Sequence, residues 1–191
     1  MPFPALAPLR SPRLVVRPVL VADLPDLLEV NGDDEVTGFL PYPTWRSLDD
    51  GFAWLQRMQG LAECGSAQQL VVERVADGKV LGGLLLFKHE PASARLEIGY
   101  VLGRRHWHQG FAHEALAAVC GHLFLDAGIR RIEAEVNPDN TASCALLRRL
   151  GFTLEGRLRQ RWTGKGRTYD TCIYGCLAQD WPRARPAGGH T

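Results

Sequence analysis

The sequence predicts an α/β (α+β) fold in which a mixed, mostly antiparallel sheet of about seven strands is flanked by about four helices. Two observations lead to this prediction. Strand-like apolar runs separated by turn signals fill much of the first half of the chain, and the apolar pattern then switches to a helical period after residue 110. The length of 191 residues suits one domain with its own core. We expect this domain to span residues 13–181, between flexible segments at 1–12 and 182–191.

The first half of the predicted sheet follows from turn and stop signals. The apolar run RLVVRP ends at Pro18. The pair Asn31-Gly32 follows the first helical stretch, and Gly60 follows the second. Asp77-Gly78 is a hairpin signal between two apolar runs. The expected elements are a strand over 13–18, helices over 22–30 and 48–59, and strands over 69–75, 80–88 and 94–102.

A helical period begins after residue 110. The apolar residues of this helix face are Ala112, Ala115, Leu116, Val119, Leu123 and Phe124. Gly128 ends the helix, and Asn140 is placed to cap a further helix that Gly151 terminates. The expected elements are a strand over 129–136, a helix over 141–150, and two long strands over 152–162 and 168–177. The strand–helix–strand crossovers make part of the sheet parallel.

Composition excludes several classes of function. The formal net charge of +1 gives no whole-molecule reason to expect nucleic acid or an anionic membrane as a partner. Prolines interrupt the apolar N-terminus, so no export signal is expected, and no apolar run approaches the ~18 residues that span a bilayer. The five cysteines fit neither a disulfide framework nor a CxxC metal pair. We therefore expect a soluble, cytoplasmic protein with reduced thiols.

Residues 97–115, EIGYVLGRRHWHQGFAHEA, join a strand to a helix through a glycine-containing loop. Gly110 at the helix start lets backbone N–H groups approach an anion, and the helix dipole adds to the attraction. Pyrophosphate is the anion that we expect to bind there, although the same residues also suit close packing of a helix start. Neither a Walker loop nor a dinucleotide fingerprint is present. His106, His108 and His113 lack metal-ligand spacing, so no metal is expected.

Four spaced elements together resemble the GNAT superfamily of acetyltransferases, in its RimJ/RimL-like branch. Residues 107–112 (WHQGFA) resemble the pyrophosphate-binding motif of that superfamily, with Trp107 where Gln or Arg is usual, a departure that fits this branch. Residues 97–100 match its EIGY strand. The remaining matches are Asn140, Ser143, Leu147 and Gly151-Phe152, followed by Tyr169-Asp170 and Asp180-Trp181. The resemblance extends from about residue 13 to residue 181.

The resemblance implies an acyl-CoA N-acyltransferase fold, acetyl-CoA as cosubstrate and a role for each element. The backbone amides that would hold the CoA pyrophosphate belong to His108, Gln109, Gly110, Phe111, Ala112 and His113. At the splay between two parallel strands, pantetheine would pair with backbone groups of Tyr100, Val101 and Leu102. Asn140 would hold the pantetheine arm, and Ser143 would lie near the thioester sulfur. Arg148 or Arg149 is placed to meet the 3′-phosphate.

The reaction implied is direct transfer of an acetyl group to a primary amine, because no residue is placed as a covalent acyl carrier. Glu97 is the candidate base, directly or through water. Ser143 is the candidate partner of the leaving thiolate, since Leu147 stands where many superfamily members have a tyrosine. Other roles stay open: Glu97 as a strand carboxylate that pairs with an arginine, Ser143 as a first-turn residue that satisfies backbone N–H groups, and Asn140 as an N-cap.

The acceptor amine follows only from the resemblance, which suggests a protein N-terminal α-amine. The same branch acetylates small amines, antibiotics and amino acids, and the loops expected to differ are 39–50 and 163–168. The aromatic residues of the first loop would line an apolar mouth or pack in its turn; they are Phe39, Tyr42 and Trp45. The rivals are a catalytically silent CoA sensor and an RNA-contacting module. The second would use the basic strand with Arg157, Arg159 and Arg161. The long C-terminal strands are compatible with a homodimer and do not require one.

Overall fold

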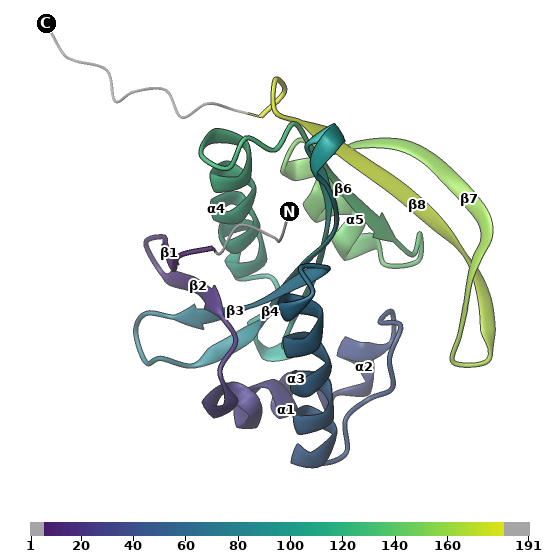
Figure 1. The fold of residues 1–191 in the computed structure, drawn as a ribbon. Coiled ribbons are helices and arrows are strands. Elements are labelled where there is room, and N and C mark those ends of the chain that lie inside the picture. The colour runs from purple at the N-terminus through teal and green to yellow at the C-terminus, as the bar shows by residue number, and fades with distance from the viewer. Residues whose placement is uncertain (1–5, 182–191) are drawn as a thin grey trace, which may run out of the picture.

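An eight-stranded sheet runs through the part of the chain that the computed structural model describes, residues 6–181 (Figure 1). The strands are β1 (Leu9–Arg10), β2 (Leu14–Pro18), β3 (Ala67–Arg74), β4 (Val80–Glu90), β5 (Arg95–Leu102), β6 (Arg131–Val136), β7 (Thr153–Gly164) and β8 (Arg167–Leu177). Their order in the sheet is β1-β2-β3-β4-β5-β6-β8-β7. The β5–β6 pair is parallel, and the other neighbouring strands of the described residues are antiparallel. The expected mixed, mostly antiparallel sheet is therefore confirmed.

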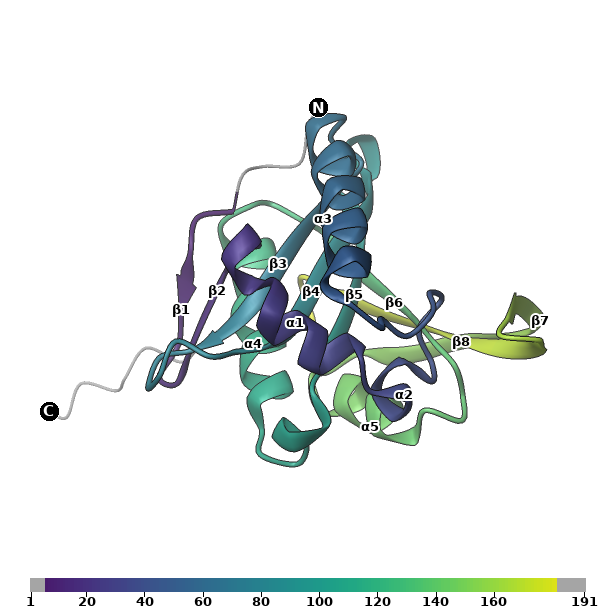
Figure 2. The same cartoon turned by 90° about the horizontal axis from the view of Figure 1, so that it is seen from below.

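Helices connect the strands on both sides of the sheet. They are the α-helices α1 (Leu24–Asn31), α2 (Asp34–Thr37), α3 (Leu48–Glu63), α4 (Phe111–Leu125) and α5 (Thr141–Arg149), and the 3₁₀ turns η1 (Val21–Asp23), η2 (Pro91–Ser93) and η3 (Arg104–His106). Figure 2 shows α1 and α3 over one face of the sheet and α4 and α5 over the other. None of the helices in the described part of the chain has the length and apolar character of a membrane span.

Several boundaries differ from those expected. Helix α3 does not end at Gly60, because the space around this glycine is open and the helix continues to Glu63. Strand β6 begins at Arg131 rather than at residue 129. Strand β1 lies inside the segment 1–12 that was expected to be flexible, and it pairs with β2. The other expected flexible segment, 182–191, lies outside the described residues.

Two apolar clusters hold the layers together. The larger one lies between the sheet and helices α4 and α5, and it includes Leu84, Leu96, Leu116, Ile132 and Tyr174. The smaller one lies under α1 and α3 and consists of Leu24, Leu27, Trp45, Leu55, Val71 and Val80. Alternation along β3 explains why the two clusters lie on opposite faces of the sheet, since the side chains of successive residues point to opposite faces of a strand. The helices of the second cluster contact β3 and β4 and leave the β5–β6–β8 part of that face uncovered.

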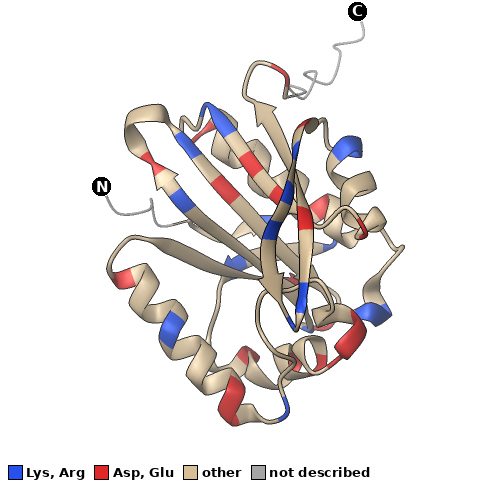
Figure 3. Cartoon of the chain, turned by 90° about the vertical axis from the view of Figure 1, so that its right-hand side faces the viewer, with Lys and Arg blue, Asp and Glu red and all other residues tan. Residues whose placement is uncertain are grey.

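The uncovered part of the sheet is charged. Along β6, Ile132, Ala134 and Val136 are buried in the larger cluster, while Arg131, Glu133 and Glu135 stand on the opposite face. Figure 3 shows acidic and basic residues side by side on the neighbouring strands of this face. Beyond it, the β7–β8 hairpin projects from the body of the domain (Figure 1). A buried core on one face and a polar surface on the other leave this region accessible to a ligand.

Candidate active site

The parallel strands β5 and β6 separate partway along their length. Their paired residues are Arg95 with Arg131, Leu96 with Ile132 and Glu97 with Glu133, and pairing ends there. Strand β5 continues to Leu102 and β6 to Val136, so the two strands diverge and leave an opening. Each strand is still paired on its other side, β5 with β4 and β6 with β8. The opening therefore presents backbone groups that an extended ligand can bind as an added strand.

Alternation of the backbone decides which residues of β5 face this opening. The N–H of Gly103 donates to the carbonyl of Leu81 in β4, so the backbone of Gly103 points away from the opening. The backbone groups of Val101 point the same way, and those of Tyr100 and Leu102 point to the opening. The Leu102 carbonyl accepts a 2.7 Å hydrogen bond from the Trp107 indole. Of the three residues expected to pair with pantetheine, Tyr100 thus offers the freest backbone, and Trp107 anchors the loop that follows.

A glycine allows β4 and β5 to lie unusually close beside the opening. A Cβ atom added at Gly82 would overlap the carbonyl oxygen of Val101 and would lie 2.8 Å from the Cα atom of Leu102. No side chain fits in that space without moving the backbone. A glycine inside an apolar strand marks either a bulge or the close approach of another backbone, and the pair Gly82-Gly83 alone does not distinguish the two.

The loop after β5 places the start of α4 ahead of the opening. His108 and Gly110 both adopt left-handed backbone conformations, with φ angles of 58° and 81°. No side chain caps α4 at Gly110, so the first amides of the helix have no partner within the helix. An uncapped 15-residue helix whose N-terminus carries partial positive charge suits a phosphate group. The pyrophosphate site expected at residues 108–113 stays a prediction that this geometry allows.

Arg13 of the region before β2 braces this loop, which the sequence analysis did not predict. Its Nη1 donates to the carbonyl of Gln109 at 3.0 Å, and its Nε donates to Glu114 at 2.6 Å. The guanidinium carbon lies 4.5 Å from the centroid of the Phe111 ring. Glu114 also accepts a hydrogen bond of 2.7 Å from the hydroxyl of Ser11. Two residues from the N-terminal end of the domain therefore fix the first turn of α4.

Helix α5 brings two predicted residues to the other side of the opening. The side-chain oxygen of Asn140 accepts a 3.1 Å hydrogen bond from the Ser143 amide, so Asn140 is the N-cap of α5. The Tyr100 hydroxyl donates to the Ser143 carbonyl over 3.5 Å, which links β5 to α5. Burial is the main cause that raises the pKa of Tyr100 above its ordinary value. Arg149 lies in the last turn of α5, at the end away from Asn140.

Glu97 lies at the point where β5 and β6 separate, and its side chain is buried. The residue is 5% exposed, and one carboxylate oxygen accepts a 2.7 Å hydrogen bond from Lys88 Nζ. Burial raises the pKa of Glu97, and the hydrogen bond from Lys88 opposes that rise. The ion-pair role left open for Glu97 is thus present, with a lysine as the partner. A buried carboxylate with a raised pKa is also what a general base requires.

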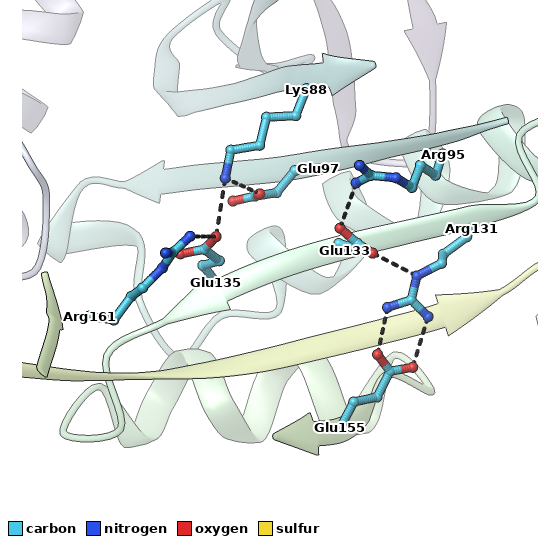
Figure 4. Close-up of polar contacts among 8 residues, drawn as sticks. All are labelled: Lys88, Arg95, Glu97, Arg131, Glu133, Glu135, Glu155 and Arg161. Carbon is cyan, nitrogen blue, oxygen red and sulfur yellow. Dashed lines mark hydrogen bonds and ion pairs between the residues drawn. The ribbon is translucent and has the colours of Figure 1, made fainter. Parts of the chain in front are cut away.

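Lys88 joins Glu97 to a second carboxylate, as Figure 4 shows. Its Nζ lies 3.1 Å from Oε1 of Glu135, and the other oxygen of Glu135 accepts 3.0 Å from the Trp162 indole. Burial alone would raise the pKa of Glu135, but the hydrogen bonds from Trp162 and Lys88 outweigh it and lower the pKa. Lys88 sits at an irregularity in the β4–β5 pairing and has a φ angle of 51°. A strand bulge of this kind redirects a side chain.

A second charged cluster on the same face is fully satisfied internally. Glu133 binds Arg95 at 3.1 Å and Arg131 at 2.7 Å, and Arg131 also binds both oxygens of Glu155 (Figure 4). An arginine thus occupies each oxygen of Glu133, whereas Lys88 binds a single oxygen of Glu97. This contrast favours Glu97 over its neighbour Glu133 as the base.

The expected acceptor loop 163–168 contacts α2, which lies just before the other expected loop, 39–50. Lys165, in the β7–β8 turn, donates to the carbonyl of Thr37 in α2 at 2.6 Å. The three loop aromatics have different surroundings. Trp45 is buried against Trp54, with ring centroids 5.3 Å apart, while the Tyr42 hydroxyl donates to Asn31 at 2.9 Å. Phe39 is exposed and remains available to a ligand.

The histidines near the loop do not form a metal centre. Among residues 6–181, no group of three or more His, Cys, Asp and Glu side chains is arranged to hold a metal ion. His106 packs edge-on to Phe111, with ring centroids 6.4 Å apart. Burial lowers the pKa of His106, and the nearby arginines and lysine lower it further. The acid–base chemistry of the site therefore centres on carboxylates.

Parallel strands that separate beside an uncapped helix start are the arrangement expected for an acyl-CoA N-acyltransferase fold. The acetyltransferase (GNAT) domain family matches residues 13–153. The chain belongs to this family and is an N-acetyltransferase.

The relatives support the same class. The uncharacterized N-acetyltransferase p20 of Bacillus licheniformis is 31% identical over 173 residues, which cover 91% of this chain and 97% of that protein. Ribosomal-protein-serine acetyltransferase of Escherichia coli is 33% identical over 84 residues, 44% of this chain and 47% of that protein. The structure of RimJ from Mycobacterium smegmatis in complex with CoA-disulfide is 26% identical with a TM-score of 0.82, covering 93% of this chain and 88% of that one. The expected RimJ/RimL-like resemblance is confirmed.

Proposed function

We propose that this chain transfers the acetyl group of acetyl-CoA directly to a primary amine, and that the acceptor is a protein N-terminal α-amine. The observation that carries the proposal is the buried carboxylate of Glu97, placed where β5 and β6 separate. The amine must be a free base when it attacks, so a proton acceptor is required beside the thioester. In this geometry Glu97 is the carboxylate that fills that position.

The residues present fit acetyl-CoA, which supplies an activated acetyl group on a thiol that leaves easily. The uncapped first turn of α4 offers amides for the pyrophosphate. The backbone of Tyr100 is free to pair with the pantetheine arm, and Asn140 and Ser143 stand across the opening from it. Arg149 would reach the 3′-phosphate from the far end of α5.

Each step of the transfer has a candidate group. Glu97 accepts the proton of the acceptor ammonium, directly or through water, and its raised pKa improves it as a base. A backbone N–H near the end of β5 donates to the oxyanion of the tetrahedral intermediate. As the carbon–sulfur bond breaks, the CoA thiolate leaves beside the Ser143 hydroxyl and takes the second proton of the attacking nitrogen. No covalent acyl-enzyme is needed.

Two observations favour a polypeptide as the acceptor. Helices α1 and α3 contact β4 and β3, and Figure 2 shows β6 and β8 extending beyond these helices, so a chain longer than the amine has room along that part of the sheet. A relative, the Escherichia coli enzyme, acts on a ribosomal protein according to its name. We place the activity in the cytoplasm, because the five cysteines are all unpaired and a reducing compartment keeps them so.

The test combines binding and turnover. Calorimetric titration with acetyl-CoA and with CoA lacking the 3′-phosphate measures affinity, and mass spectrometry of peptides with free or blocked N-termini measures transfer. We expect micromolar binding, transfer to free N-termini only, and a loss of about 100-fold in kcat for Glu97→Gln with unchanged acetyl-CoA affinity. Absence of acetyl-CoA binding would refute the proposal, and transfer to small amines alone would refute the polypeptide acceptor.

A further inference from the structure

The β7–β8 hairpin exposes an edge strand on both of its faces. Strand β7 pairs only with β8 and forms one edge of the sheet. All of its residues are exposed except Gly156 and Gly164. Figure 1 shows the hairpin projecting from the body of the domain, and its turn contacts α2 through the hydrogen bond of Lys165 to Thr37. Its outer edge therefore carries backbone N–H and C=O groups that can pair with an extended chain.

The hairpin is basic, as the blue bands on it in Figure 3 show. Its cations are Arg157, Arg159, Arg161, Lys165 and Arg167. Asp170 neutralises Arg157 at 2.7 Å, and Glu135 lies 3.9 Å from Arg161. Within residues 6–181, Arg159, Lys165 and Arg167 have no carboxylate within ion-pair distance. Asp170 and Asp34 act on Arg159 and Lys165 only at longer range, so the hairpin keeps an excess of positive charge.

Exposed apolar side chains alternate with these cations. Leu154, Leu158 and Trp162 are 42–43% exposed, and the Arg161 guanidinium lies 5.9 Å from the centroid of the Trp162 ring. Leu154 and Leu158 add nothing to the buried core. Apolar and cationic side chains along an open edge strand provide pockets for side chains and partners for carboxylates in the same segment.

A bulge connects this surface to the candidate active site. The β7–β8 pairing shifts between Leu158 and Trp162, and Gln160 has a φ of 49° with its N–H bound to Asp170 at 2.9 Å. The Trp162 indole then reaches Glu135, which Lys88 joins to Glu97. A chain whose terminal amine reaches Glu97 from this face therefore passes Glu135 and meets the hairpin next.

We infer that the β7–β8 hairpin binds an extended acidic segment of the acceptor polypeptide, immediately downstream of the amine that is acetylated. This inference rests on the proposed function. An acidic segment is favoured over a second copy of this chain, because a two-fold contact between hairpins would bring like charges together. It is favoured over RNA, because the open strand edge and the exposed leucines suit a peptide backbone and its side chains. RNA stays as an outcome of the test.

The experiment uses the full chain and three peptides with the same free N-terminal serine. Their downstream residues are aspartate, asparagine or lysine in otherwise identical sequences. The test variant is Arg159→Gln with Arg167→Gln, and the matched control is Arg10→Gln with Arg57→Gln, which removes the same charge from exposed positions on β1 and α3. Acetyl transfer to each peptide is measured at low and at high salt, and binding of a single-stranded RNA oligonucleotide is measured for all proteins.

We expect kcat/KM to be highest for the aspartate peptide and to fall about five-fold for that peptide in the test variant, at low salt. Transfer to the asparagine peptide should stay unchanged in both variants. Equal transfer to all three peptides would overturn the inference while leaving the acetyltransferase intact. No transfer to any peptide would instead count against the proposed function. RNA binding that the test variant abolishes, with unchanged peptide kinetics, would assign the hairpin to nucleic acid and overturn the inference.

Discussion

Replacing Lys88 with methionine should make the enzyme require a higher pH. Lys88 donates to Glu97 at 2.7 Å and to Glu135 at 3.1 Å, and its ammonium group favours the ionised form of both. Burial already raises the pKa of Glu97, and Lys88 opposes that rise. Lys88→Met removes the opposing charge, so the pKa of Glu97 rises further. A base is inactive below its pKa, and the acidic limb of the pH profile should therefore move upward.

The size of the shift follows from the distance and the exposure. Two unit charges 2.7 Å apart attract by about 6 kcal/mol at an effective dielectric constant of 20 and by about 1.5 kcal/mol in water. The Lys88 side chain is 46% exposed, so solvent screens the pair and the lower figure applies. That figure corresponds to about one pKa unit. Methionine keeps most of the length and apolar contact of the side chain, which limits other effects.

The assay is the pH dependence of kcat/KM for acetyl transfer, measured for the native protein, Lys88→Met and Lys88→Arg. Arginine retains the positive charge and should keep the acidic limb near its native position. A rise of about one unit in Lys88→Met alone would support the assignment of Glu97 as the base. An acidic limb at the native pH in Lys88→Met, with a stable fold, would refute it, because the titrating group would then not feel Lys88.

Three further predictions concern the cofactor side of the site. Gly82→Ala should separate β4 from β5, since the new Cβ overlaps the Val101 carbonyl. Thermal unfolding should show a loss of about 2 kcal/mol in stability, and titration should show weaker binding of acetyl-CoA. Native stability and native affinity would contradict this prediction. Asn140→Ala should lower the free energy of unfolding in urea by about 1 kcal/mol because it removes the cap of α5, whereas Asn140→Asp should keep the cap. A loss of acetyl-CoA affinity in the aspartate variant would show that Asn140 has a separate role in binding. Arg13→Met should lower acetyl-CoA affinity several-fold and should lower stability by no more than about 1 kcal/mol, because the exposed ion pair with Glu114 orients the loop more than it stabilises the fold. Native affinity for acetyl-CoA would argue against that bracing role.

Periodicity and turn signals predicted most of the fold. The β-strands with strong alternation and the amphipathic α4 were expected from the sequence, and the structure confirms them. The short elements β1 and α2 were not predicted, because two or four residues carry too little periodic signal. Helix α3 passes through Gly60 because nothing packs there and tertiary context decides the boundary.

The candidate site was predicted in its parts but not in its connections. Glu97 and Asn140 were recognised through spaced motifs, which are local in sequence. The contacts of Lys88 with Glu97 and with Glu135 depend on a bulge in β4 and on the parallel register of β5 with β6. Neither is readable from one sequence, since a shift by one residue reverses every side chain of a strand. The same holds for Arg13, which is far from Gln109 in the chain and touches it in the fold.

The opening between β5 and β6 also sets how the protein behaves without its ligand. From Ile98 onward, β5 has no backbone pairing with β6, and β6 has none with β5 beyond Glu133. Amides that face this gap should exchange with solvent deuterium quickly in the free protein and slowly in the complex. A ligand present at about a hundred times its dissociation constant adds about 2.7 kcal/mol to the stability of the folded state. The cellular level of acetyl-CoA would then govern the lifetime of the enzyme as well as its rate.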